Sequence, residues 1–148
     1  MQTTLYRLLP PPLRRSVTPD RLVMAAQFAR FGVVGLIGLV IDTATVYGLR
    51  HQLGLYGAGM AAYVVAATVN WILNRNWTFR GQGSGPAHLQ WGMFMITNLA
   101  GFVLNRGTYA ILVTFVAAAA NQPVIATAAG SIAGMFVNFS LSRRLVFR

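Results

Sequence analysis

The stretch that decides the fold is Asn70 to Arg80, Asn-Trp-Ile-Leu-Asn-Arg-Asn-Trp-Thr-Phe-Arg. It closes a long apolar segment with amides, an arginine and aromatic residues. A second copy of the pattern ends the chain, from Val137 to Arg148. At a constant offset of 68 residues, Asn70 matches Asn138, Arg75 matches Arg143, Phe79 matches Phe147 and Arg80 matches Arg148. Two copies of one apolar-to-polar boundary indicate a duplicated protein whose two polar-tipped helices face the same side.

The composition of the chain excludes a soluble globular protein. Of its 148 residues, 55% are hydrophobic and only 9% are charged. The apolar residues fall in four blocks, each near the ~20 residues that a helix needs to cross ~30 Å of hydrocarbon. The blocks are roughly Phe31 to Leu49, Leu55 to Leu73, Trp91 to Ala118 and Pro123 to Leu141. We therefore expect an all-α integral membrane protein with four transmembrane helices.

The net charge of +10 could suggest a nucleic-acid partner, but the placement of the arginines indicates membrane topology instead. We therefore expect no nucleic-acid partner. Arginines cluster before the first block, after the second and after the fourth (Arg7, Arg14, Arg15, Arg21, Arg30; Arg75, Arg80; Arg143, Arg144, Arg148). Cytoplasmic segments of membrane proteins are enriched in arginine, so both termini and the middle loop are expected in the cytoplasm. Attraction to anionic lipid accounts for most of these charges.

The chain divides into three expected parts. Residues 1–17, with Pro10-Pro11-Pro12 and paired arginines, indicate a mobile basic cytoplasmic tail. Residues 18–30 begin with a capping threonine and a proline, and they suit an interfacial helix lying at the membrane surface. Residues 31–148 form the four-helix membrane domain.

The duplication covers most of this membrane domain, as repeats of about residues 27–80 and 90–148. Gln27 to Leu49 aligns with Gln90 to Leu112 at an offset of 63, so that Phe31 matches Phe94 and Asp42 matches Asn105. Each repeat contains two spans, so both repeats enter the membrane in the same direction. We expect two parallel repeats related by an axis along the membrane normal.

Every expected span has a stripe of small and polar residues at helical spacing. The stripes are Gly35, Gly38, Asp42 and Thr45; Tyr63, Asn70, Asn74 and Trp77; Asn98, Gly101, Asn105 and Thr108; and Ser131, Gly134, Asn138 and Ser142. Small and amide residues also pack membrane helices together, as Gly130 and Gly134 would. Asn98 and Asn105 are candidates for a polar path across the membrane.

Two charges are expected inside the membrane. Asp42 lies near the middle of the first span, and Arg106 lies at a similar depth in the third. Each charge is costly there, and an ion pair between Asp42 and Arg106 would relieve both. A purely structural pair and a pair that lines a substrate path both fit the sequence; in the second case a phosphate could replace Asp42 as the partner of Arg106.

A phosphate site is expected at the cytoplasmic ends of the spans. Arg75 and Arg143 are repeat-equivalent, and Asn70, Asn74 and Asn138 lie one to two turns deeper. Arginine forks with amide donors beside them suit phosphate or diphosphate groups, whereas arginines that extend to the headgroups are the alternative. Tyr63, Trp71 and Trp77 are candidates for stacking on a sugar or for anchoring at the interface.

No enzyme site can be assembled from the sequence. The chain has two carboxylates, Asp20 and Asp42, and two histidines in different loops, and it has no cysteine. It has no nucleophile–histidine–acid set, no phosphate-binding glycine loop and no metal-ligand spacing. We expect neither a metal nor another cofactor.

At Arg30-Phe31, Gly35, Asp42 and the Asn70 to Arg80 stretch, the sequence resembles the GtrA-like family. The likeness spans about Phe28 to the C-terminus. It implies a four-span protein of the bacterial inner membrane that moves a polyprenyl-phosphate-linked monosaccharide, such as an undecaprenyl phosphate sugar, from the cytoplasmic to the outer leaflet for cell-envelope polysaccharide modification. The second copy has Ser142 in place of Asn74 and Leu145 in place of Trp77.

This translocase, or flippase, is the main functional hypothesis, with the lipid-linked sugar and membrane lipid as its partners. A membrane anchor that recruits a glycosyltransferase is one alternative. A small-solute transporter using Asp42 is another. The sequence leaves open whether the chain forms a homodimer.

Overall fold

The computed structural model describes residues 18–83 and 85–148, and these are helical apart from short connections. They form four helices, α3 (Pro19–Leu73), α4 (Ala87–Phe115), α5 (Ala117–Asn121) and α6 (Pro123–Leu141). A π-helical turn follows α3 and another follows α6, namely η1 (Asn74–Thr78) and η2 (Ser142–Val146). This part of the chain contains no strand. The tail expected for residues 1–17 lies outside the described residues.

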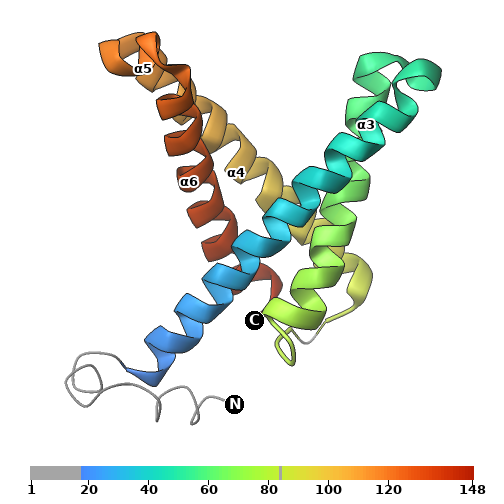
Figure 1. Ribbon diagram of the computed structural model, residues 1–148. Coiled ribbons are helices and arrows are strands. Elements are labelled where there is room, and N and C mark those ends of the chain that lie inside the picture. The colour runs from blue at the N-terminus through green and yellow to red at the C-terminus, as the bar shows by residue number, and fades with distance from the viewer. Residues whose placement is uncertain (1–17, 84) are drawn as a thin grey trace.

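Helix α3 is a hairpin with two limbs. Gly54 has φ 67° and ψ 173°, a backbone conformation that only glycine adopts without strain, and the chain reverses there (Figure 1). The first two apolar blocks therefore lie on separate limbs. The interfacial helix expected for residues 18–30 is not a separate element, because the helix runs from Pro19 through Arg30 into the first block without a break. Neither proline nor a left-handed glycine interrupts it there.

The second hairpin is formed by α4 and α6. The predicted third block, Trp91 to Ala118, divides at Val116, whose extended backbone separates α4 from the short α5. Glycines let α6 approach α4 closely. A Cβ at Gly130 would lie 2.6 Å from the Asn105 carbonyl oxygen, and one at Gly134 would lie 2.8 Å from that of Gly101. Such small residues are what allow two membrane helices to pack backbone to backbone.

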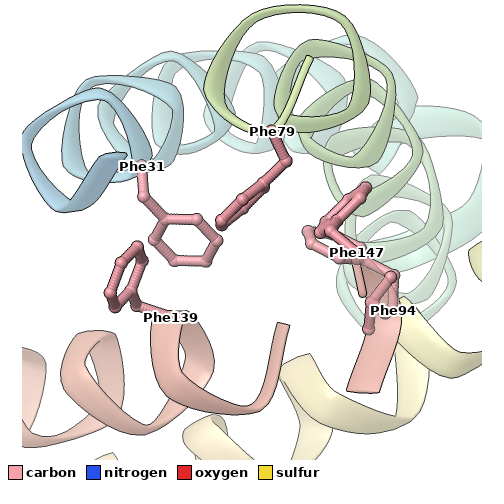
Figure 2. Close-up of a cluster of buried hydrophobic side chains, with 6 residues drawn as sticks. Phe31, Phe79, Phe94, Phe139 and Phe147 are labelled. Atoms are coloured by element: carbon pink, nitrogen blue, oxygen red, sulfur yellow. The ribbon is translucent and has the colours of Figure 1, made fainter. Parts of the chain in front are cut away.

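The two hairpins spread apart toward the Gly54 and α5 ends and come together near the C-terminus (Figure 1). A buried aromatic cluster joins them at the converging end (Figure 2), and it consists of Phe31, Phe79, Phe94, Phe139, Val146 and Phe147. Phe79 and Phe147 stack with ring centroids 4.6 Å apart and an interplanar angle of 13°. This repeat-equivalent pair thus lies at the contact between the two repeats.

The neighbouring rings of the stacked pair are also arranged alike in the two repeats. Phe31 meets Phe79 with centroids 6.3 Å apart and an angle of 65°. The equivalent rings, Phe94 and Phe147, lie 6.1 Å apart at 65°. Residues at matched positions therefore share both sequence and packing, as expected for two repeats related by an approximate twofold axis through the stacked rings.

The π-helical turns explain how Phe79 and Phe147 reach this cluster. The N–H of Phe79 donates to the Asn74 carbonyl at 2.8 Å, and that of Phe147 donates to the Ser142 carbonyl at 2.9 Å. In an α-helix, residues five apart point about 140° away from each other. The wider turn instead lets Asn74 and Phe79, and likewise Ser142 and Phe147, be buried together.

By length and hydropathy, two helical segments of the described residues could cross a membrane, Pro19–Thr78 and Val124–Val146. The first has 60 residues, about three times the length that one crossing needs. Since it folds back at Gly54, its apolar length is divided between two antiparallel limbs.

Candidate functional site

A cavity of about 470 Å³ lies between the two hairpins, with Phe31 and Phe94 of the aromatic cluster in its wall. Residues of α3, η1, α4 and α6 line it. Its polar lining consists of Asp42, Tyr63, Asn70, Asn74, Asn98, Asn105, Ser131 and Asn138. The structure thus brings together seven of the predicted site residues, namely all of these except Ser131, around one space.

Two asparagines enter the cavity wall through gaps left by glycines. A Cβ added to Gly38 would overlap the Asn70 side chain, and one added to Gly101 would overlap that of Asn138. These two contacts are repeat-equivalent. Within each repeat, the first helix therefore carries the glycine and the second helix carries the amide that fills the space.

The amides leave buried acceptor oxygens without partners. The side-chain Oδ1 atoms of Asn70, Asn74 and Asn138 are buried and make no hydrogen bond. Asn74 is the most buried of the three residues, with 1% of its surface exposed. Ser142, the equivalent of Asn74, is fully buried and its Oγ also has no partner. A buried polar atom without a partner costs about 1–3 kcal/mol. The three asparagines line the cavity, whereas Ser142 does not, so the asparagines make the cavity a candidate binding site.

Four other polar residues of the cavity are engaged with the protein itself. Asn98 donates from Nδ2 to the Phe94 carbonyl at 2.9 Å. The Asn105 amide lies 3.5 Å from the Ser131 hydroxyl. The Tyr63 hydroxyl donates to the Met95 carbonyl at 3.1 Å and so links the first repeat to α4 of the second.

The predicted pairing of Asp42 with Arg106 is not formed. No ion pair occurs among residues 18–83 and 85–148, and Arg106 instead lies over the Phe102 ring, 5.6 Å from its centroid. The reason is helical geometry. Asn105 is the position aligned with Asp42 and it faces the cavity, and the next residue along an α-helix points about 100° away. Arg106 is thus exposed outside the cavity, while Asp42 lines it.

Arg75 is held by the protein. Its Nη1 donates to the Gln90 Oε1 at 2.6 Å, and its guanidinium lies over the Trp71 ring at 5.6 Å. The same Gln90 oxygen accepts from Trp71 Nε1 at 3.2 Å, and Gln90 Nε2 donates to the Val146 carbonyl at 3.1 Å. The glutamine therefore ties the end of the first repeat to η2 of the second. Sequence reasoning did not single out Gln90.

Arg143 has a different environment from its equivalent, Arg75. It lines a surface pocket of about 540 Å³ together with Gly81, Gln82, Gly83, Phe147 and Arg148. Gln27 is the equivalent of Gln90, yet its Oε1 is buried and unpaired, and only its Nε2 is bonded, to Gln82 Oε1 at 3.1 Å. Within the described part of the chain, Arg143 makes no hydrogen bond or ion pair, so its guanidinium remains available to a ligand.

The two predicted tryptophans lie outside the cavity. Trp71 packs against the aromatic cluster and Arg75. Trp77 is exposed, and Arg30 reaches it with a 3.4 Å hydrogen bond to its carbonyl and a contact 5.8 Å from its ring. Of the three candidate sugar-stacking aromatics, only Tyr63 lines the cavity.

A sequence model of the family described as GtrA/DPMS, transmembrane domain, matches residues 30–147. The chain belongs to this family. The match begins just before Phe31 and ends at Phe147, so it includes both repeats and the whole aromatic cluster. With its apolar helices, a transmembrane domain of this kind makes the chain a membrane protein. A comparison with curated proteins found no match.

The GtrA/DPMS domain presents hydrogen-bonding and ionic groups rather than a metal site. Among the described residues, no three histidine, aspartate or glutamate side chains lie close enough together to hold a metal ion. The arrangement offers binding by amides and a carboxylate in the cavity, and binding by two arginines in the surface pocket beside Phe147.

Proposed function

We propose that this protein is a flippase that moves a polyprenyl-phosphate-linked monosaccharide from the cytoplasmic to the outer leaflet of a bacterial inner membrane. The observation that carries the proposal is the cavity between the repeats, where the oxygens of Asn70, Asn74 and Asn138 are buried without partners. A sugar supplies hydroxyl donors to such acceptors, and a site left with unpaired polar groups favours the ligand that satisfies them.

The surface pocket at Arg143 and Arg148 is the proposed entry site for the phosphate. Arginine binds phosphate through parallel N–H donors, and two arginines in one pocket can hold a diester from two sides. Arg75 is not assigned this role, because Gln90 and Trp71 already hold its guanidinium. The prenyl tail remains in lipid throughout.

The aromatic cluster separates the entry pocket from the cavity. Phe147 lines the pocket, Phe94 lines the cavity, and their ring centroids lie 6.1 Å apart. The proposed transport step is a separation of Phe79 from Phe147 that lets the headgroup pass. In this proposal the structure is closed at the arginine-rich end, because the aromatic cluster packs the two hairpins together there.

Reconstitution tests this function. Purified protein in liposomes is supplied with a prenyl-phosphate-linked glucose, and the fraction of headgroups accessible on each side is followed over time. Flippase activity predicts equilibration faster than in protein-free liposomes, and Asn138→Leu should slow it at least tenfold. Equal rates with and without protein would contradict the proposal. Deleting residues 1–17 separates it from the anchor hypothesis, since transport in liposomes should survive that deletion.

A further inference from the structure

Asp42 is the one carboxylate in the wall of the cavity, and none of the described residues that line the cavity is basic. Its helix, the first limb of α3, also presents Gly35 and Gly38 to this space. The second limb contributes Tyr63 and amides, and α4 and α6 contribute amides and Ser131. Tyr63 is therefore the only other ionisable group of this wall, and its hydroxyl is bonded to Met95.

The charge of the wall, rather than its amides, distinguishes between ligands. Each asparagine carries two N–H donors as well as an acceptor oxygen, so the amides can bind either a phosphate or a sugar. Asp42 adds a negative charge that no basic residue of the described lining offsets, and this charge repels a phosphate group. An ammonium group has three donors, no acceptor and a positive charge, and sugar hydroxyls supply further donors. The chemistry of the wall therefore fits a sugar with a protonated amine better than it fits a phosphate.

Asp42 also lacks a charged partner among residues 18–83 and 85–148. A carboxylate inside a membrane domain is costly unless a cation neutralises it, and Arg106, the predicted partner, lies outside the cavity. A ligand that brings the missing positive charge would remove this cost. The same charge would offset the negative phosphate of the headgroup, so that its charge would be balanced while it crosses.

We propose that Asp42 is a specificity-determining residue that selects amino sugars over neutral sugars and rejects acidic sugars. This inference rests on the proposed function, since it concerns the sugar carried by the lipid phosphate. In the bound state, the sugar occupies the cavity with its ammonium group at Asp42, and its hydroxyls form hydrogen bonds with the Asn70, Asn74 and Asn138 amides.

Binding to three matched lipids tests the proposal. The probes carry one short prenyl phosphate and differ only in the sugar: 2-amino-2-deoxyglucose, glucose or glucuronic acid. Affinities are measured for the protein in nanodiscs. The native protein should bind the amino sugar about tenfold or more tightly than glucose, which corresponds to about 1.4 kcal/mol, and glucuronic acid most weakly. In Asp42→Asn the amino-to-neutral ratio should fall to about one.

Asp20→Asn is the matched control, because it removes the other carboxylate, which lies exposed in the first turn of α3. It should leave the order of the three affinities unchanged. If the native protein binds the amino sugar and glucose equally, the selectivity proposal is wrong even if Asp42→Asn fails to fold. Retention of the preference in Asp42→Asn would remove Asp42 from the role. If none of the three lipids binds, the proposed function fails with it.

Discussion

At the scale of single residues, the glycines facing Asn70 and Asn138 determine whether the cavity can form. Gly38→Ala and Gly101→Ala each place a methyl group where an asparagine side chain lies. Overpacking of this kind costs about 1–3 kcal/mol, so both variants should lower the melting temperature in detergent. Gly35→Ala and Gly92→Ala are the controls, because nothing lies within 4 Å of a Cβ at either position.

The direction of this effect can be checked by a second substitution. Combining Gly38→Ala with Asn70→Ala removes the side chain that the new methyl group would meet. The double variant should therefore regain part of the stability that Gly38→Ala loses. If Gly38→Ala is no less stable than Gly35→Ala, Gly38 does not pack closely against Asn70 in the folded protein.

The two equivalent arginines should respond differently to loss of charge. Arg75→Gln breaks a 2.6 Å charged hydrogen bond to the buried Gln90, which should cost about 1–2 kcal/mol of stability and lower the melting temperature. Arg143→Gln breaks no hydrogen bond of the described structure, so its melting temperature should stay unchanged. It should instead weaken binding of a prenyl phosphate about tenfold.

The neighbouring Arg144 provides a control for the second variant, since it is exposed and does not line the arginine pocket. Arg144→Gln should change neither stability nor prenyl-phosphate affinity. Equal losses of affinity in Arg143→Gln and Arg144→Gln would mean that general attraction between arginine and the lipid surface, rather than the pocket, holds the phosphate.

At the scale of elements, Gly54 makes α3 a hairpin rather than one rod. A residue with a side chain at positive φ and extended ψ, as at Gly54, costs about 1–3 kcal/mol, so Gly54→Ala should be destabilised by this amount. Space is not the cause, since nothing lies within 4 Å of a Cβ there. Gly59→Ala, in the following limb, also meets open space and should be neutral or slightly stabilising, because alanine favours helix.

The melting temperatures of these two variants measure the difference directly. If Gly54→Ala and Gly59→Ala melt together, the positive φ at Gly54 does not describe the folded protein.

At the scale of the whole molecule, the orientation in the membrane remains a prediction from the placement of arginines. The chain has no cysteine, so single cysteines can be labelled without background. His88→Cys, at the start of α4, should react with a membrane-impermeant thiol reagent only from the cytoplasmic side. Tyr56→Cys and Gln122→Cys, both at the spread ends of the hairpins, should react only from the opposite side.

Labelling of all three positions from one side would contradict the four-span arrangement. Labelling with reversed sides would keep the four spans but place the arginine pocket outside the cytoplasm. In that case the pocket at Arg143 could not serve as the cytoplasmic entry for the phosphate, and the direction of the proposed transport would be reversed.

The sequence by itself determined the helical fold, the family and several of the polar residues that line the cavity. Apolar blocks of membrane length allow little besides helices, since the backbone must satisfy its own hydrogen bonds in lipid. Helical spacing placed Asp42, Asn98 and Asn105 on faces that the structure brings to one cavity. The constant offset of 68 identified Phe79 and Phe147 as equivalent residues, which the structure stacks on each other.

Only the tertiary structure decided which equivalent residues act alike. Arg75 and Arg143 match in sequence, but Gln90 binds Arg75 whereas Arg143 lines a surface pocket. The partner of each arginine depends on which residues of the other repeat pack beside it. Helical spacing relates residues of one helix, so it could not show that Arg106 lies apart from Asp42, which is on another helix. Helical periodicity in the sequence does not reveal the π-helical turns. These turns let Asn74 be buried with Phe79, and Ser142 with Phe147, beside an aromatic cluster that forms only when the two repeats pack together.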